Sequence, residues 1–144
     1  MKQECAFCSL AIHTGEAAVV YEDEGLLAFM DRQPINRGHA LVIPKSHQPI
    51  LFDLEPATYG RVMFLVWALA RSVQRVIKPL RVGLVVVGFD VPHAHVHVVP
   101  MHDYHDITSM AILENRRGNP GKQELLEIAG LLQKDLTKAH DFAI

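Results

Sequence analysis

The sequence predicts an α+β fold with five strands and two main helices, in one domain that spans residues 1–144. The candidate strands follow one another in runs instead of alternating with helices. One long segment, residues 59–77, has the apolar period of an amphipathic helix. After it, two β-branched segments are separated only by a short turn, which leaves no room for a crossover helix and favours antiparallel pairing.

We expect a short helix and three strands in the first third of the chain, where brief apolar runs alternate with turn formers. They are placed at residues 5–14 (helix), 18–22, 26–30 and 39–44 (strands). The turn Asp23-Glu24-Gly25 joins the first two strands as a hairpin. Pro44 ends the third strand because it lacks the N–H that a sheet ladder requires.

The long helix has start and stop signals of its own. Asp53 or Glu55 is a candidate N-cap, and Pro56 fits the first turn, where a missing N–H costs little. Pro79 ends the helix.

After the long helix, residues 81–87 are expected to form a buried strand and residues 93–99 the last strand. Residues 101–118 are expected to be irregular, although residues 109–113 could form a helical turn. Asn119 and Pro120 look like the cap and first residue of a last helix, which occupies about residues 121–138.

Composition excludes several classes of protein. Hydrophobic residues make up 49% of the chain and charged residues 21%, as in an ordinary globular domain. The net charge of -2 gives no electrostatic basis for binding a nucleic-acid polymer. No apolar run approaches the roughly 18 residues of a membrane span, and the first residues do not resemble a signal peptide. We therefore expect no membrane partner and a cytoplasmic location.

The segment His93-Ala94-His95-Val96-His97 alternates histidines with apolar residues. In an extended chain, successive side chains point to opposite faces, so the three histidines line one face at intervals of about 7 Å. The intervening apolar residues then face the core. Imidazole serves as nucleophile, general acid-base or metal ligand near neutral pH, so this row is the main candidate for chemistry.

The two cysteines, Cys5 and Cys8, are three residues apart near the start of the chain. A disulfide between them would close too small a loop to stabilise much. In a reducing compartment this spacing indicates half of a zinc site or a redox pair, or it has no role. No strand precedes the pair, as it usually does in redox motifs, which favours a metal site or no role.

Four short motifs follow one another along the chain. They are Cys5-X-X-Cys8, the hairpin end at residues 29–31 (FMD), the block at residues 38–47 (GHALVIPKSH), and the histidine segment at residues 93–100 (HAHVHVVP). In these motifs the chain resembles the histidine triad (HIT) superfamily, and in particular bacterial Hint-like members with an N-terminal Cys pair. The resemblance covers about residues 5–100. Residues 101–144 correspond to a tail that varies in the family and helps to set the substrate.

The resemblance implies a five-stranded antiparallel sheet with two helices and a homodimer in which helices and sheets pair. It also implies hydrolysis or transfer at the α-phosphate of a nucleotide, through a covalent nucleotidyl-histidine. Members include nucleoside phosphoramidases and dinucleoside polyphosphate hydrolases, so the expected ligand is a purine nucleotide or a nucleotide conjugate.

Three histidines are the catalytic candidates. The resemblance places the nucleophile at His95, and the middle position of the row agrees, since flanking imidazoles can orient it and bind phosphoryl oxygens. His97 is expected to hydrogen-bond the α-phosphate and offset charge in the transition state. His39 matches a family position that supports the nucleophile, although a histidine satisfied within a sheet is the alternative.

The resemblance also implies nucleotide-binding residues. Asp31 matches a carboxylate that accepts hydrogen bonds from the ribose hydroxyls; the alternative is an ordinary turn aspartate. Phe29 and Arg32 flank it and are candidates for contact with the base. Backbone N–H groups around Asp90 and Val91 are candidates for contact with the phosphate.

The loop before the histidines departs from the family pattern. Many relatives have an Asn and a Gly-Gln-Ser type loop there, whereas the segment at residues 85–92 is shorter, lacks the Asn, and has Phe89 and Asp90 in the places of Gln and Ser. A carboxylate repels a phosphate unless it is protonated, paired or turned away. The resemblance therefore does not determine the leaving group or the substrate.

Family members with the N-terminal Cys pair bind zinc through two further histidines, which correspond here to His47 and His93. The resemblance therefore implies a structural zinc site formed by Cys5, Cys8, His47 and His93. Such a site has the four N and S ligands that zinc prefers.

Two other classes of function remain as alternatives. The three strand histidines could jointly bind a catalytic zinc ion, but a straight row spans about 14 Å, too long for one tetrahedral ion without a bend. The chain could also be a nucleotide-binding module without catalysis.

Overall fold

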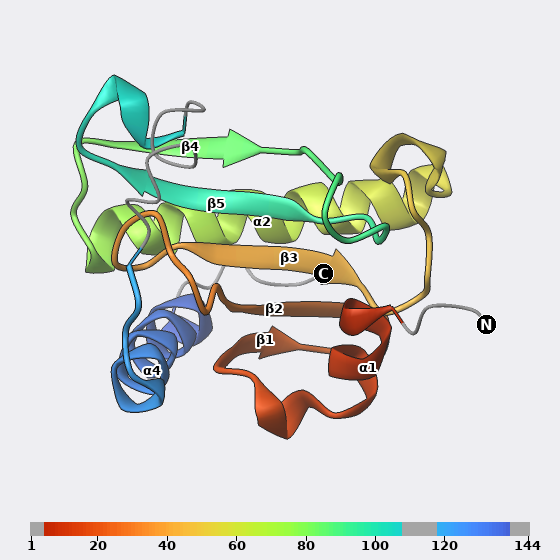
Figure 1. Cartoon of the computed structure of the whole chain (residues 1–144), viewed down its shortest axis with the longest axis horizontal. Helices are drawn as coiled ribbons and strands as arrows, with labels where there is room; N and C mark the ends of the chain where they lie inside the picture. The colour runs from red at the N-terminus through yellow and green to blue at the C-terminus, as the bar shows by residue number, and fades with distance from the viewer. Residues whose placement is uncertain (1–4, 108–117, 139–144) are drawn as a thin grey trace.

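The computed structural model describes residues 5–107 and 118–138, which form an antiparallel five-stranded sheet with the order β1-β2-β3-β5-β4 (Figure 1). The strands are β1 (Val19–Glu22), β2 (Leu26–Met30), β3 (Ala40–Pro44), β4 (Arg81–Val85) and β5 (Val96–Met101). Every pair of neighbouring strands is antiparallel. The predicted fold class is confirmed.

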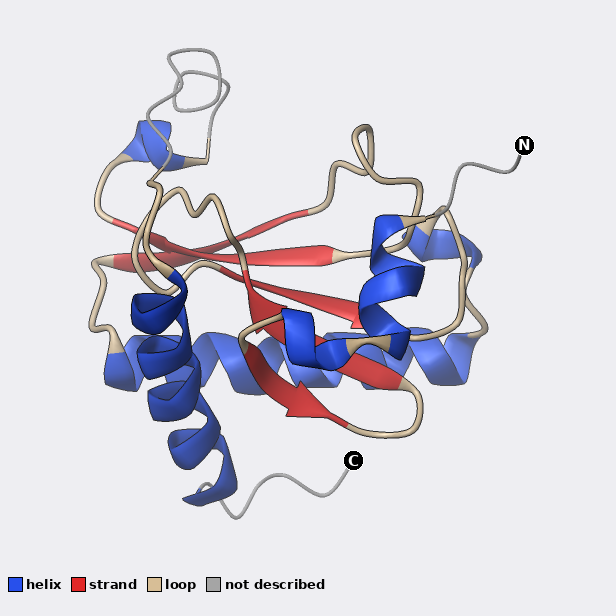
Figure 2. Cartoon of the chain, turned by 60° about the horizontal axis from the view of Figure 1, so that its bottom comes forward, coloured by secondary structure: helices blue, strands red, loops and turns tan. Residues whose placement is uncertain are grey.

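The helices cover both faces of this sheet. In the described residues they are α1 (Ala6–Ile12), α2 (Pro56–Val76) and α4 (Lys122–Lys138), with short 3-10 turns at Thr14–Glu16, Leu51–Asp53 and Tyr104–Asp106. The long helix α2 runs behind the sheet in Figure 1, and α4 packs against α2 and β1. Figure 2 shows α1 on the opposite side of the sheet from α2. Among the described residues, no helix has the length and apolar character needed to cross a membrane.

The core has two parts because the central strands bury both of their faces. The larger part lies between the sheet and helices α2 and α4, and it includes Ala94, Val96 and Val98. The smaller part lies under α1, where Phe7 and Leu10 pack on side chains of β2 and β3. Successive residues of β2 and β3 enter the two parts alternately, so every residue of these strands is buried.

The histidine segment differs from the prediction in its secondary structure. β5 begins at Val96, not at His93. The His93 N–H donates to the Val91 carbonyl at 2.8 Å, and the Ala94 N–H donates to the Gln48 carbonyl at 2.6 Å, so this stretch bonds to loops before it joins the sheet. The predicted alternation still holds, because Ala94 and Val96 enter the main core while the histidines face the side that carries α1.

The expectation of a buried strand at residues 81–87 is wrong. β4 ends at Val85 and pairs only with β5, so it is the edge strand of the sheet. Leu84, Val86 and Val87 are each about half exposed, at 48%, 46% and 51%. Burial within one chain therefore does not explain the apolar composition of this segment.

The start of α2 lies where the sequence predicts it, whereas the start of α4 differs from the prediction. α2 begins at Pro56 with Glu55 in the N-cap position, but the Glu55 side chain makes no capping hydrogen bond. α4 begins at Lys122, so Asn119 and Pro120 precede the helix instead of starting it. The helical turn suggested for residues 109–113 lies outside the described residues.

The turn between β1 and β2 is fixed by one carboxylate. Asp23 accepts hydrogen bonds from the N–H groups of Gly25 and Leu26 at 2.8 and 2.7 Å, and from Tyr21 and Arg61 at 2.8 Å each. Burial by itself raises the pKa of Asp23, but these donors outweigh it and hold the pKa below its ordinary value. Burial and the same hydrogen bond raise the pKa of Tyr21 to about 12.

A carboxyl group with a depressed pKa stabilises the fold above its unfolded pKa of about 3.9, and this contribution is lost as the pH falls through the folded pKa. We expect Asp23→Asn to lower the free energy of unfolding by about 1–2 kcal/mol at pH 7. The deficit should shrink at pH 3 and below. Urea unfolding of the variant, of wild type and of the exposed control Asp53→Asn tests this. An equal deficit at both pH values would show that the charge of Asp23 does not matter.

Candidate active site and metal centre

The larger cavity has a volume of about 780 Å³, which lies within the usual range for small-molecule sites. It lies between α1, the end of β2, the start of β3 and the connection from β4 to β5. Eight of the predicted site residues line it: Phe29, Asp31, Arg32, His39, Asp90, Val91, His95 and His97. The fold therefore brings all predicted catalytic and nucleotide-binding residues to one place.

His95 is held in one tautomer. Its Nδ1 lies 2.6 Å from the backbone carbonyl oxygen of His93. A carbonyl only accepts hydrogen bonds, so the network assigns the proton to Nδ1 and leaves a lone pair on Nε2. Among the described residues, none hydrogen-bonds to Nε2. His95 is 7% exposed and lines the cavity, so its ring presents an unprotonated nitrogen there.

His97 is held in the complementary state by a chain of hydrogen bonds. The backbone N–H of Ile35 donates to Nδ1 of His39 at 3.1 Å, which assigns the His39 proton to Nε2. That Nε2–H then donates to Nδ1 of His97 at 2.9 Å. In neutral His97 the proton is therefore on Nε2. The ring centroids of His95 and His97 are 5.0 Å apart. The acceptor Nε2 of His95 and the donor Nε2–H of His97 therefore lie on the same wall of the cavity.

Asp31 lies beside this histidine pair. Its Oδ2 is 3.5 Å from Nε2 of His39 and 3.9 Å from Nδ1 of His97, while Oδ1 accepts from the Gln33 N–H at 2.8 Å. Asp31, His39 and His97 bring their ligand atoms within 4.8 Å of one another and could hold a cation. However, the 2.9 Å separation of the two imidazole nitrogens fits a shared proton.

A second cluster contains the four predicted metal ligands. Sγ of Cys5 is 3.4 Å from Nδ1 of His93, and Sγ of Cys8 is 3.5 Å from the same nitrogen and 3.2 Å from Nδ1 of His47. All four ligand atoms lie within 4.8 Å of one another. In a tetrahedral zinc site, bonds of about 2.3 Å to sulfur and 2.0–2.1 Å to nitrogen place S and N about 3.5 Å apart. The cluster fits zinc in ligand type and spacing.

The protonation of these ligands also fits a metal. Nε2 of His93 lies 2.8 Å from the Pro44 carbonyl oxygen, so it carries the proton and Nδ1 directs a lone pair at the thiols. Burial lowers the pKa of His93 and so favours the neutral form that binds metals. Burial and the adjacent Cys5 raise the pKa of Cys8, so metal binding would release a proton from this thiol.

Sequence reasoning missed two parts of the site. Phe7 lines the large cavity, and its ring lies edge-on to His95 with the centroids 5.2 Å apart. The signal in the sequence that could have identified Phe7 is its position between the two cysteines. The backbone N–H of Ile35 fixes the tautomer of His39, and a backbone donor leaves no signal in the side-chain pattern.

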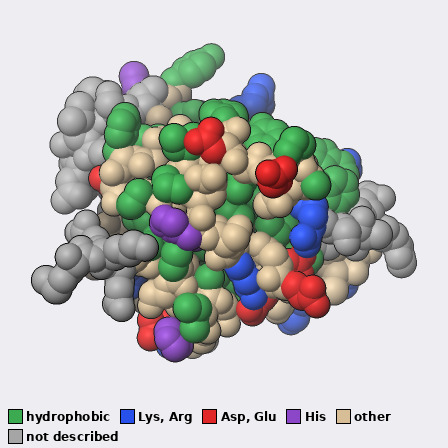
Figure 3. All heavy atoms as spheres, turned by 90° about the vertical axis from the view of Figure 1, so that its right-hand side faces the viewer, with side chains coloured by type: hydrophobic (Ala, Val, Ile, Leu, Met, Phe, Trp, Pro, Cys, Tyr) green, Lys and Arg blue, Asp and Glu red, His purple; other side chains and the backbone are tan. Residues whose placement is uncertain are grey.

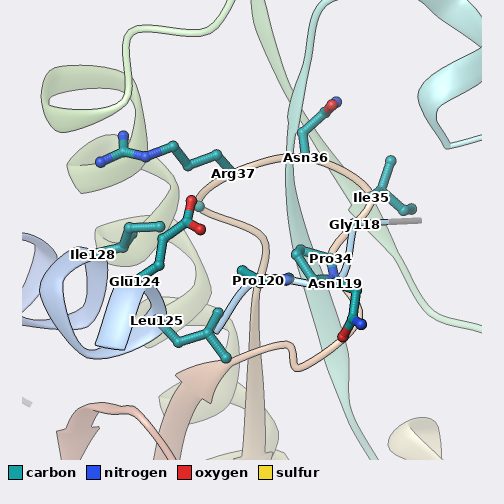
Figure 4. A pocket seen from close by; sticks show the side chains of 11 residues that line it. Pro34, Ile35, Asn36, Arg37, Gly118, Asn119, Pro120, Glu124, Leu125 and Ile128 are labelled. Carbon is teal, nitrogen blue, oxygen red and sulfur yellow. The ribbon is translucent and has the colours of Figure 1, made fainter. Parts of the chain in front are cut away.

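A smaller cavity of about 470 Å³ lies between the loop 34–38 and the start of α4 (Figure 4). Arg37 and Glu124 supply its charged side chains, which Figure 4 shows on the same side of the cavity. Its described lining residues include no histidine, cysteine or hydroxyl group. Of these two cavities, the larger one therefore holds the residues suited to nucleophilic chemistry.

An antiparallel sheet with three alternating histidines, of which two line one cavity and the third faces the cysteine pair, defines the class of a histidine triad protein. The chain belongs to the HIT domain family, whose sequence model matches residues 14–104.

Among curated proteins, the chain is 36% identical to an uncharacterized HIT-like protein of Methanocaldococcus jannaschii over 69% of this chain and 80% of the relative. It is 26% identical to an adenylylsulfatase of Arabidopsis thaliana over 69% of this chain and 53% of that protein.

Two solved structures are similar over almost their whole length. A Zn-bound histidine triad family protein from Mycobacterium smegmatis has a TM-score of 0.76 and 28% identity, with coverage of 97% of this chain and 98% of that chain. A hypothetical histidine triad nucleotide-binding protein from Sulfolobus tokodaii has a TM-score of 0.80 and 26% identity, with coverage of 97% and 99%.

Proposed function

We propose that the protein is a nucleotide hydrolase or transferase that acts at the α-phosphate of a nucleotide conjugate through a nucleotidyl-His95 intermediate. The substrate is a phosphoramidate or a dinucleoside polyphosphate. The main support is the hydrogen bond from His95 to the His93 carbonyl, which leaves Nε2 unprotonated in the cavity. The adenylylsulfatase relative and the nucleotide-binding structural neighbour support nucleotide chemistry.

In the first step, the lone pair on Nε2 of His95 forms a bond to the α-phosphorus. The bond from phosphorus to the leaving group breaks with its electron pair, and the leaving group takes a proton from solvent. His97 donates its Nε2–H to a phosphoryl oxygen and offsets the charge that develops there. The His93 carbonyl stabilises the proton that His95 retains on Nδ1.

In the second step, water attacks phosphorus and gives up one proton to solvent, while the P–N bond breaks and its electron pair returns to Nε2 of His95. The products are a nucleoside monophosphate and the protonated leaving group. A transferase would use another acceptor in place of water.

The nucleotide itself is bound by the wall of the cavity next to Asp31. We propose that this carboxylate binds the ribose hydroxyls and that Phe29 and Arg32 contact a purine base. The backbone near Val91 contacts the phosphate. Asp90 is exposed, so water screens its charge and weakens its repulsion of the phosphate.

The proposed function is tested with an adenosine phosphoramidate and a diadenosine polyphosphate. We expect turnover of at least one of them, and intact-mass spectrometry after acid-free quenching should detect the protein with one added nucleotidyl group. Binding of AMP without turnover of either compound would instead support a non-catalytic nucleotide-binding module.

A catalytic zinc site built from all three triad histidines is not supported by the geometry. His93 directs Nδ1 at the cysteines, whereas His97 pairs with His39. If such a site operated, no nucleotidyl adduct would form and chelation would stop turnover at once.

We expect His97→Ala to lower kcat by roughly 10²–10³, because it removes a hydrogen-bond donor that faces the developing charge. AMP affinity should fall much less. Steady-state kinetics and calorimetry measure the two effects separately, with the exposed His102→Asn as the matched control. A loss confined to KM would show that His97 binds the ground state only.

We also propose that the protein is a homodimer paired through the edge strand. Leu84, Val86 and Val87 on or after β4 are half exposed, as is Trp67 on α2. Figure 3 shows hydrophobic side chains gathered along the upper part of one face of the molecule. Apolar side chains on an unpaired strand edge favour association with another chain.

Sedimentation equilibrium should give twice the chain mass of 16.1 kDa. Leu84→Glu should shift the protein to monomer, because a carboxylate at a dimer contact loses its hydration. The exposed Leu126→Glu on α4 is the matched control. A wild-type monomer at micromolar concentration would contradict this prediction.

The cytoplasmic location stays a prediction from the sequence.

A further inference from the structure

We infer that the metal centre at Cys5, Cys8, His47 and His93 positions the reacting imidazole of His95, in addition to fastening the N-terminal segment to the sheet. His93 and Phe7 are the positioning residues that connect the two. This inference rests on the proposed function of His95. It goes beyond a purely structural metal site, because an occupied centre would set the orientation of His95 and the affinity for nucleotide.

The first connection runs through His93. Its imidazole is fully buried and belongs to the metal centre, at 3.4 Å from Sγ of Cys5. Its backbone carbonyl accepts the proton of His95 Nδ1 at 2.6 Å. The same residue therefore contributes its ring to one site and its carbonyl to the other. A rotation of His93 would change the hydrogen bond that selects the His95 tautomer.

The ladder of β5 does not hold the His93 backbone, because β5 begins only at Val96. The Ala94 N–H donates to the carbonyl of Gln48, and Gln48 directly follows the metal ligand His47. His93 Nε2 is bonded to the Pro44 carbonyl. The segment before β5 is thus held by the last residue of β3 and by the loop after it, and a bound metal would tie that loop to the segment at a second point.

The second connection runs through Phe7, which lies between the two cysteine ligands in the sequence. Its ring contacts His95 at a centroid distance of 5.2 Å and Phe29 at 5.6 Å, and it lines the large cavity. Helix α1 has seven residues, none of them fully buried, and no side-chain cap. A helix this short has little stability of its own, so metal ligation would fix the position of Phe7.

The test compares the His95 ring in zinc-loaded wild type and in Cys8→Ser. Long-range ¹H–¹⁵N spectra of the imidazole report the tautomer directly. We expect one Nδ1–H pattern in wild type, and a second tautomer or exchange broadening in the variant. We expect the Kd for AMP, measured by calorimetry, to rise about fivefold or more.

Asp135→Asn is the control for general destabilisation. Asp135 makes a two-point ion pair with Arg75 between α4 and α2, and it lines neither cavity. This variant should melt earlier than wild type but keep the wild-type His95 spectrum and AMP affinity. If it alters both as Cys8→Ser does, or if Cys8→Ser alters neither while folded, the inference is overturned.

Cadmium exchange into wild type keeps the test decisive if Cys8→Ser does not fold. Cadmium forms longer bonds to the same ligands, so the His95 nitrogen resonances should shift relative to the zinc protein, and identical spectra would overturn the inference. The outcome is separate from that of the proposed function. A His95 response without any nucleotidyl adduct would refute the proposed chemistry and leave the connection intact.

Discussion

Replacement of His95 by alanine or asparagine is expected to lower turnover of nucleotide phosphoramidates by a factor of about 10⁴ or more. The reason is that, among the described residues that line the cavity, no other side-chain nitrogen combines a lone pair with a retained proton held by a carbonyl. His97 has the opposite assignment, with its Nδ1 accepting from His39. The nucleotidyl adduct should also disappear from the intact-mass spectrum.

Binding provides the control for this prediction. AMP should still bind to His95→Asn within a few fold of wild type, because asparagine keeps much of the volume and a polar tip. His102→Asn, exposed at the end of the sheet, should turn over at the wild-type rate. Substantial activity in both His95 variants would end the proposal that this residue is the nucleophile.

Cys8→Ser is expected to abolish stoichiometric zinc binding and to lower Tm by roughly 8–16 °C. A ligand present at about a thousand times its Kd stabilises a protein by about 4 kcal/mol, and each kcal/mol corresponds to about 2–4 °C for a domain of this size. Elemental analysis and thermal unfolding with and without a chelator measure the two effects.

The matched control is Ser9→Ala, which changes an exposed hydroxyl group of the same helix without touching the ligand set. It should keep both zinc and Tm. Unchanged zinc content in Cys8→Ser would refute the metal site, and a chelator without effect on wild-type Tm would refute its contribution to stability.

Most of the fold could be predicted because local pattern and tertiary structure agree in it. The apolar period of α2 and the alternation in the histidine segment each identify the buried face correctly, since Val62, Val96 and Val98 are all in the main core. The strand at residues 81–87 was predicted as buried because apolar composition alone does not distinguish a core strand from an edge strand that another chain could cover.

The side chains of the candidate site could be predicted from the sequence. The backbone groups that take part in the site could not. The spacing of Cys5 and Cys8 favoured a metal site or no role, and the resemblance implied a zinc site and supplied His47 and His93, which the structure brings together with the cysteines. The hydrogen bonds that set the tautomers come from the backbone of His93 and Ile35. Every residue has these groups, so only the folded geometry shows which of them act.

Strand β3 connects the two candidate centres, because residues at its two ends belong to the active site and contact the metal centre. His39 immediately precedes Ala40 at one end, and the carbonyl of Pro44 holds His93 at the other, so the strand separates the backbones of His39 and Pro44 by about 17 Å. A slip of one residue between β3 and β5 would turn His39 to the opposite face and displace the Pro44 carbonyl together. Errors in strand pairing during folding would therefore inactivate both centres at once, so partially functional misfolded forms should not accumulate.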